Sequence, residues 1–354
     1  MAKLAFLLLL LALGSPAGAE TLDAAMGGKL FRRVWVGAPA STKAADGLGP
    51  LFSAASCATC HPGGGSSNHT VTRLGNSGHG DPLYGRQVQA FSVAGLSGEE
   101  GWPLGALDPG TKLSRRRPPD LAPAGAIAAL DDDAILAREG SAGGRVSRLP
   151  DGRLGRFGWK ATSATLDEQI AGAFSMDMGM STALFPDPHG DCTGAEAGCK
   201  AAPTGSDRGE PEVADAIVAS LAAFVRSLAP ASPGPPGSEL LGRFGCATCH
   251  APVLRDRAGR EARVFSDLLL HDLGAQLDDG LAEPGTASSE WRTAPLLGIG
   301  RHLARGGRLM HDGRAGSIAE AVAFHGGDAA FARDAFAAAP DADRGALETY
   351  LKGF

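Results

Sequence analysis

The pentapeptide Cys-Ala-Thr-Cys-His occurs twice in this chain, at residues 57–61 and again at residues 246–250. On a helical turn the spacing i, i+3 brings both sulfurs to one side, and the next residue presents its imidazole beside them. That arrangement suits a haem whose two vinyl groups are joined to sulfur and whose iron is bound by histidine. The sequence therefore predicts two covalently bound haems c, held by Cys57, Cys60 and His61 and by Cys246, Cys249 and His250.

Two other uses of paired cysteines compete with haem attachment. A redox-active Cys-x-x-Cys pair usually follows a strand in an α/β unit, and no such unit is visible in this sequence. The four cysteines of the two pentapeptides could in principle be pooled on one zinc ion. Zinc, however, does not require a histidine directly after each pair, and its ligand pairs are normally much closer in sequence. The repeated motif therefore favours haem.

The first 19 residues have the layout of a signal peptide. Lys3 is followed by an apolar run from Leu4 to Leu13, and Ala17-Gly18-Ala19 supplies the small residues that a signal peptidase reads. The apolar run is too short to span a bilayer comfortably, and a buried N-terminal helix is the alternative interpretation. We expect cleavage near Ala19, export to the periplasm and no membrane span.

Charge and composition narrow the class of protein. The formal net charge is −6, which gives no electrostatic support to a nucleic-acid partner. The 51 glycines and 23 prolines predict a loop-rich chain, and alternating strand patterns are scarce, so we expect a mainly α fold with long irregular loops. Cys192 and Cys199 bracket a short loop, and in an oxidising compartment they should form a structural disulfide. Nothing in the composition indicates an oligomeric state.

A proline-rich linker at residues 229–237 divides the chain into two predicted domains, residues 20–228 and residues 238–354. Apolar residues at helical spacing predict one helix over residues 213–228 and a terminal helix over residues 343–354. Each half then has the order helix, pentapeptide, irregular stretch and closing helix. The first half differs by a much larger insertion.

Each iron needs either a sixth protein ligand or an open position, and this choice separates an electron carrier from a catalyst. For the second haem, Met310 is the first candidate because it lies just before a helix near the chain end, although it could instead pack in the core; His311 is the second. For the first haem, His79 is preferred to His69 because it allows a longer return loop. The other sources of ligands are Met176, Met178, Met180 and His271. We expect these methionines to pack at a porphyrin edge, and the last histidine either ligates or bonds to a propionate or the backbone.

Several sequence blocks, taken in order, resemble the bacterial di-haem oxidoreductase family, which is related to the di-haem cytochrome c peroxidases and the MauG-like enzymes. They are GLGPLFSAASCATCHPGGG, YGRQVQ, GRFGWKA, DMGMSTALFP, GCATCHAPVL, FSDLLLHDLG, EWRTAPLLGIG and LMHDGRAGSIAEAVAFHGG. Together they cover most of the chain after the signal peptide. The resemblance implies two cytochrome c-like domains that face each other, with a first haem that meets peroxide and a second that collects electrons.

The resemblance also implies a partner and a metal. Electrons would come from a small periplasmic donor such as a cytochrome c or a cupredoxin. Thr293 and Pro295 in the stretch WRTAP resemble the Thr-x-Pro segment that supplies calcium ligands between the haems of those peroxidases. Calcium therefore joins haem c as an expected cofactor.

A peroxidase also needs a carboxylate or an amide that polarises the O–O bond and moves a proton. The candidates follow the first pentapeptide and are Gln87, Gln89, Glu99 and Glu100, each of which could instead be a solvated loop residue. Trp102 and Trp159 are candidates for the route between the irons, or for burial in an aromatic-poor core. The expected function is cytochrome c peroxidase-like reduction of peroxide. A pure electron-transfer di-haem cytochrome and MauG-like oxidation of a partner protein are the alternatives.

Overall fold

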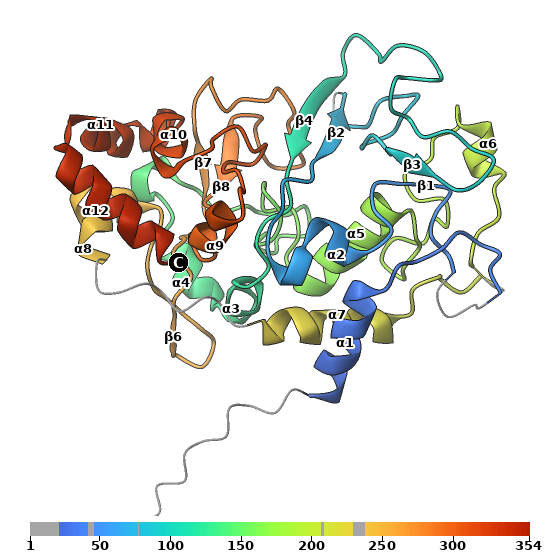
Figure 1. The fold of residues 1–354 in the computed structure, drawn as a ribbon, viewed down its shortest axis with the longest axis horizontal. Helices are drawn as coiled ribbons and strands as arrows, with labels where there is room; N and C mark the ends of the chain where they lie inside the picture. The colour runs from blue at the N-terminus through green and yellow to red at the C-terminus, as the bar shows by residue number, and fades with distance from the viewer. Residues whose placement is uncertain (1–20, 42–45, 77, 207–208, 229–237) are drawn as a thin grey trace, which may run out of the picture.

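The computed structural model describes residues 21–41, 46–76, 78–206, 209–228 and 238–354, which Figure 1 draws in colour. The predicted signal peptide and the predicted linker lie outside the described residues. Of the described residues, 33% are in helices and 14% in strands, so helix is the larger regular component and irregular segments make up the rest. No described helix combines the length and the apolar character that crossing a membrane would require.

The first pentapeptide forms helix α2 (Cys57–Cys60) and packs among three other helices, α1 (Leu22–Arg32), α5 (Leu166–Met178) and α7 (Asp215–Ser227). Helices α1 and α7 cross closely because Gly27 has no side chain: a Cβ there would lie 1.9 Å from the carbonyl oxygen of Ser220. Phe31 and Phe224 pack at the same crossing, with ring centroids 5.0 Å apart. Helix α7 confirms the helix predicted over residues 213–228.

The second pentapeptide lies in the C-terminal half, whose helices run from yellow at α8 to red at α12 in Figure 1. They are α8 (Ser238–Arg243), η3 (Cys246–Thr248), α9 (Ile299–Ala304), α10 (Ile318–Ala323), η4 (Gly327–Ala329), α11 (Ala330–Ala338) and α12 (Asp341–Lys352). The terminal helix predicted over residues 343–354 is confirmed as α12. It buries Leu347, Tyr350 and Leu351, and Phe354 is buried after it.

The described strands form four small antiparallel pairs. They are β1 (Leu51–Phe52) with β3 (Phe91–Ser92), β2 (Val71–Gly75) with β4 (Lys112–Arg116), β5 (Leu254–Arg255) with β6 (Glu261–Ala262) and β7 (Leu270–Asp272) with β8 (Glu290–Arg292). The β2–β4 pair is the longest and follows the first pentapeptide, after η1 (Pro62–Gly64). The strands therefore act as local ties within the long loops.

Residues between the two pentapeptides join the halves into one core. Figure 1 shows the green helices α3 (Ala124–Ala129) and α4 (Asp132–Leu136) beside the orange and red elements. Backbone bridges link Leu130 to Asp256 and Arg145, just after η2 (Ser141–Gly143), to Leu270. The apolar side chains of this segment pack with Leu254, Val264 and Leu268 in one cluster. Residues before and after the predicted linker therefore pack together. The composition of a linker does not determine which half an upstream segment contacts. The division into two domains stays a prediction.

The predicted disulfide is confirmed between Cys192 and Cys199, whose Cα atoms are 6.1 Å apart. Cys199 belongs to α6 (Ala197–Lys200). Both cysteines are buried against Leu51 of β1, so the bridge fixes the loop after α5 to the strand that precedes the first pentapeptide.

Candidate functional site

A single cavity of about 510 Å³ is lined by both pentapeptides. The two motifs lie far apart in the sequence, and the cysteines and histidines of both line this one cavity. A volume of this order is typical of cofactor sites. The structure therefore brings together the six residues predicted to hold haem.

The histidines of the two motifs have the same hydrogen-bonding geometry. His61 Nδ1 lies 3.2 Å from the carbonyl oxygen of Gly65, and His250 Nδ1 lies 3.4 Å from that of Phe265. Because a carbonyl oxygen only accepts, Nδ1 carries the proton and Nε2 keeps its lone pair. Burial lowers the pKa of both imidazoles to about 4, so they are neutral at pH 7. Metal-ligating histidines are usually held in this way.

The cysteines of the motifs are poorly suited to redox or zinc chemistry. Burial, with a further contribution from the charge of Asp177, raises the pKa of Cys57 and Cys60 to about 12, and burial raises that of Cys246 to about 11. A redox-active cysteine needs the opposite shift, because the thiolate is the reactive form. The four thiols also do not converge on one point among the described residues. Both alternatives to haem attachment are therefore disfavoured by the geometry.

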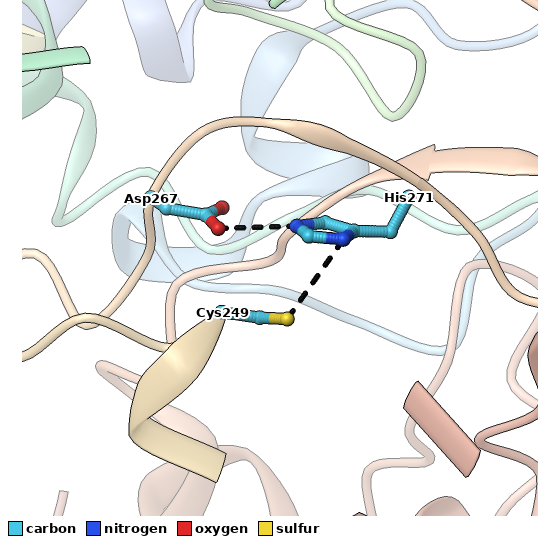
Figure 2. A group of neighbouring side chains, drawn as sticks. All are labelled: Cys249, Asp267 and His271. Atoms are coloured by element: carbon cyan, nitrogen blue, oxygen red, sulfur yellow. Dashed lines mark hydrogen bonds and ion pairs between the residues drawn. The ribbon is translucent and has the colours of Figure 1, made fainter. Parts of the chain in front are cut away.

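One of these cysteines belongs to a compact polar cluster, shown in Figure 2. His271 Nε2 lies 3.1 Å from Asp267 Oδ2, and its Nδ1 lies 3.8 Å from Cys249 Sγ. Burial opposes a charge on His271, but Asp267 and Cys249 outweigh it and raise the pKa to about 10. A metal ion could use these donors only while the sulfur is free, and thioether formation removes that ligand. With haem attached, Cys249 would no longer raise the His271 pKa, and His271 would keep its contact with the buried Asp267.

A second imidazole faces His250. The ring centroids of His250 and His325 are 6.5 Å apart, and both side chains line the cavity. Metal–nitrogen bonds of about 2 Å on each side, with the ring radii added, give a separation of roughly 6 Å. His325 Nδ1 bonds to the carbonyl oxygen of Ala321 at 2.8 Å, which leaves its Nε2 free, and burial lowers its pKa. His325 therefore has the position and the tautomer of a ligand opposite His250.

His325 was not among the residues predicted from the sequence. The prediction searched the loop before α10, where Met310 and His311 lie, and the facing ring instead comes from the residues just after that helix. The available signal was a lone histidine directly after an amphipathic helix, in the block AVAFHGG. Without the fold, nothing indicates that this end of the helix faces the cavity.

Met310 and His311 line the cavity at the junction of the two halves. Arg117, which comes from the first half, donates its Nε to the carbonyl oxygen of Met310 and its backbone N–H to that of His311. The His311 ring stacks on Trp291 with centroids 3.6 Å apart and lies edge-on to Trp159 at 6.4 Å. Burial, together with nearby cations, lowers the His311 pKa to about 3. His311 thus links two indoles between the motifs.

The remaining predicted ligands are split between the cavity and the surface. His69 lines the cavity, whereas the exposed His79 does not and forms a backbone pair with Asn76. Met178 lines the cavity, and Met180 is fully buried in the core of α1, α5 and α7. The cavity wall therefore offers His69 rather than His79.

None of the four predicted catalytic residues lines the cavity. Gln87, Gln89 and Glu99 are buried behind its wall, and Glu100 is exposed. Burial, followed by an interaction with Glu196, raises the Glu99 pKa to about 9. Of the two predicted tryptophans, Trp159 lines the cavity, whereas Trp102 packs on Tyr84 outside it. The polar residues that do line the wall include Asp177 and Arg73, which the sequence did not single out.

Buried cations in the wall indicate a negatively charged ligand. Arg117 and Arg292 line the cavity, and burial lowers the pKa of each guanidinium to about 10. Both donate to backbone carbonyls, and neither has a carboxylate at ion-pair distance among the described residues. A buried charge without a counter-ion is costly. The propionate groups of haem are suitable counter-ions, so the donor set of the cavity fits haem.

The residues do not fit calcium at the predicted Thr-x-Pro segment. The carbonyl oxygen of Thr293 accepts hydrogen bonds from Ser266 Oγ at 2.7 Å and from Arg292 at 3.1 Å. These bonds use both lone pairs of the oxygen. The guanidinium of Arg292 also places a positive charge beside this carbonyl oxygen, and Ca²⁺ requires six to eight oxygen ligands.

A comparison with known protein families supports the interpretation that the cavity binds haem. A sequence profile of the family described as "Di-haem oxidoreductase, putative peroxidase" matches residues 148–354, more than half of the chain. Among solved structures, the chain is similar to a hydrazine synthase chain from Kuenenia stuttgartiensis, with 13% identity, coverage of 100% of both chains and a TM-score of 0.39. At that TM-score the likeness supports no argument about fold or chemistry. No curated protein matches the sequence.

Proposed function

The chain belongs to the di-haem oxidoreductase family, and from that premise we propose that it is a periplasmic enzyme that reduces peroxide with electrons from a small donor protein. The observation that carries the proposal is the pair of neutral, carbonyl-anchored histidines, His61 and His250, in one cavity. Haem supplies the redox chemistry when bound. The residues of the chain attach it, set the ligands of its iron and position the polar groups around the substrate.

Each haem is held by one pentapeptide. Cys57 and Cys60 form thioethers with the first haem, and Cys246 and Cys249 form them with the second. The high thiol pKa values of Cys57, Cys60 and Cys246 support this assignment, because these three sulfurs are stable inside the fold as neutral thiols or thioethers rather than as thiolates. Arg117 and Arg292 would hold propionate groups.

The two sites then have different tasks. His250 and His325, whose rings face each other, would both hold the second haem, and two protein ligands would suit that haem to collecting and passing on electrons. Among the described residues, no ring contact with His61 corresponds to that of His325 with His250. His69 lines the same cavity and would have to stay off the iron for the first site to bind peroxide. Trp291, His311 and Trp159 lie in contact between the motifs and offer an aromatic path between the two haems.

Location and partner follow from the sequence and the disulfide. The signal peptide over residues 1–19 directs the chain to the periplasm, where the Cys192–Cys199 bridge can form and persist. A small periplasmic cytochrome c or cupredoxin delivers electrons to the second haem. The low sequence pI of about 5.9 favours a donor with a basic docking surface.

The test uses the full chain expressed in a host that matures cytochromes c. The purified protein should carry two haems by mass, keep haem staining on a denaturing gel and consume peroxide with reduced cytochrome c. A bare polypeptide mass would contradict covalent attachment. Two haems without peroxide consumption would indicate an electron carrier or, if a partner protein is oxidised instead, a MauG-like enzyme.

A further inference from the structure

A carboxylate at the end of α5 lies in the cavity wall beside the first pentapeptide. Asp177 lines the cavity together with Cys57, Cys60 and His61. Its side chain keeps an exposed fraction of 29%, whereas the helix residues around it pack into the core. We propose that Asp177 takes up and returns the proton when peroxide reacts at the first haem, an inference that rests on the function proposed above.

The backbone of Asp177 is tied to the segment that leads into the first pentapeptide. Its carbonyl oxygen accepts from the backbone N–H of Ser53 at 2.8 Å and from that of Ala54 at 3.1 Å. The helix ends at Gly179 with φ +65°, and a Cβ there would lie 2.6 Å from the carbonyl oxygen of Leu51. Only glycine permits so close a contact in this conformation. The end of α5 is therefore held at a fixed distance from the motif.

A buried amide network orients the Asp177 side chain. Gln87 Nε2 donates to Asp177 Oδ1 at 2.9 Å and also lies 2.9 Å from Ser53 Oγ. Ser53 Oγ in turn donates to Gln89 Oε1 at 2.9 Å, and Gln89 Nε2 donates to the carbonyl oxygen of Met176 at 2.8 Å. The two glutamines predicted to be catalytic are therefore positioning residues, which act through Asp177.

The guanidinium of Arg73 lies near the Asp177 carboxylate, and the described residues leave one carboxylate oxygen without a hydrogen bond. Arg73 of β2 places a guanidinium nitrogen 4.0 Å from Asp177 Oδ1 and lines the same cavity. No hydrogen bond to Oδ2 is formed by the described residues. Oδ1 is therefore held by the protein, whereas Oδ2 is available to a substrate, and the neighbouring guanidinium can stabilise negative charge on a peroxide oxygen.

Two other carboxylates line the described cavity wall, and both are engaged by the protein. Asp120 accepts from the backbone N–H of Ala122 at 2.9 Å and lies 3.8 Å from a guanidinium nitrogen of Arg301. Glu283 lies 3.1 Å from a guanidinium nitrogen of Arg116. Both carboxylates are thus occupied with structural partners, and the α5 carboxylate is the one with an oxygen to spare beside the first motif.

The proton balance defines the role. As peroxide binds, Oδ2 of Asp177 removes the proton from one oxygen. The O–O bond then breaks, and the same proton passes to the departing oxygen, which leaves as water. The donor proposed above supplies two electrons, and two protons from solvent complete the second water. Hydrogen peroxide thus gains two electrons and two protons overall and becomes two water molecules.

The test compares Asp177→Asn and Asp177→Glu with the wild-type holoprotein in two assays. The first is kcat/KM for peroxide. The second is the rate at which cyanide binds to the oxidised or half-reduced protein, followed by absorption; hydrogen cyanide also gives up a proton on binding but needs no electron transfer. Loss of a positioned acid–base group should slow both by roughly 10²-fold, and Asp177→Glu should restore part of each rate. Asp167→Asn, at the exposed start of the same helix, is the matched control and should change neither.

The outcomes separate the two proposals. Wild-type rates of cyanide binding in Asp177→Asn, at unchanged haem content and melting temperature, would overturn the role of Asp177 whatever the peroxide activity. A wild-type protein that binds no cyanide in either redox state would also overturn it, because the first site would be closed. Slow cyanide binding in the variant of a protein that consumes no peroxide would leave Asp177 in its role and refute the peroxidase function.

Discussion

The two pentapeptides have the same sequence but face different surroundings. Both place a neutral histidine with Nδ1 on a backbone carbonyl, at Gly65 in one case and at Phe265 in the other. The second is faced by the ring of His325 and flanked by the ring of His271. The first is flanked by the carboxylate of Asp177 instead. The motif thus predicts where a haem would attach, and neighbours from distant parts of the chain give each motif its own surroundings.

The largest effect should come from removing one attachment site at a time. Replacing Cys57 and Cys60 by Ala should leave about half of the haem, all of it at the second site, and abolish peroxide reduction. Replacing Cys246 and Cys249 should also leave about half, at the first site, and abolish turnover with the donor. Haem staining and intact mass measure the content. Loss of both haems from either variant, in a folded protein, would contradict independent sites.

Removing the facing imidazole should make the second site more like the first. His325→Ala should convert the second haem from six-coordinate to five-coordinate, which is visible in the absorption and EPR spectra. His325→Met should keep six ligands and raise the reduction potential, because a thioether replaces a nitrogen ligand. Met310→Leu is the control and should leave both spectra unchanged. A change in Met310→Leu alone would instead make Met310 the ligand, as predicted from the sequence.

The pair of His271 with Asp267 beside the second motif should make the free energy of unfolding depend on pH. Burial opposes a charge on His271, but Asp267 raises the His271 pKa above its ordinary value of 6.5, so folding takes up a proton above pH 6.5. The pair with Asp267 therefore contributes fully below about pH 6.5, and its contribution is lost as the pH rises through the raised pKa. His271→Gln should cost roughly 3–5 kcal/mol at neutral pH, because it leaves a buried carboxylate uncompensated.

Denaturant unfolding of the wild type and His271→Gln at several pH values tests this prediction. The difference in unfolding free energy should shrink as the pH rises through the raised pKa. A difference that stays constant across this range would show that His271 stabilises the fold as a neutral ring. Asp177→Asn serves as the comparison at the first motif and should show no such pH window.

The smallest effect should follow the addition of a calcium chelator. Since Thr293 already accepts two hydrogen bonds and Arg292 supplies the positive charge, a chelator should change neither the spectra nor the melting temperature. Thermal unfolding with and without added calcium is the measurement. A melting temperature that rises with calcium concentration would reveal a site that the described residues do not form.

Much of the local structure could be predicted from the sequence. The helices ending at Ser227 and Lys352 follow from apolar spacing, and the disulfide between Cys192 and Cys199 follows from compartment and proximity. The packing of the segment around Leu130 and Arg145 against the C-terminal half could not be predicted, because it depends on pairings between residues more than 100 positions apart. The role proposed for Gln87 and Gln89 could not be predicted either. Their residue type suggested that they are catalytic, whereas the structure buries them behind the cavity wall, where Gln87 donates to Asp177 and Gln89 to the carbonyl oxygen of Met176.

The sequence by itself determined the two candidate haem-attachment motifs, since two thiols and an imidazole within five consecutive residues are brought together by local geometry alone. It also determined the net charge, the leader-like first residues and the closing helices. Only the tertiary structure decided that His325 faces one motif, that Asp177 lies beside the other, and that Ser266 and Arg292 occupy the carbonyl oxygen of Thr293. These residues lie beside the motifs because distant segments of the chain pack around one cavity. The local spacing of residues in the sequence does not show which distant segments pack together.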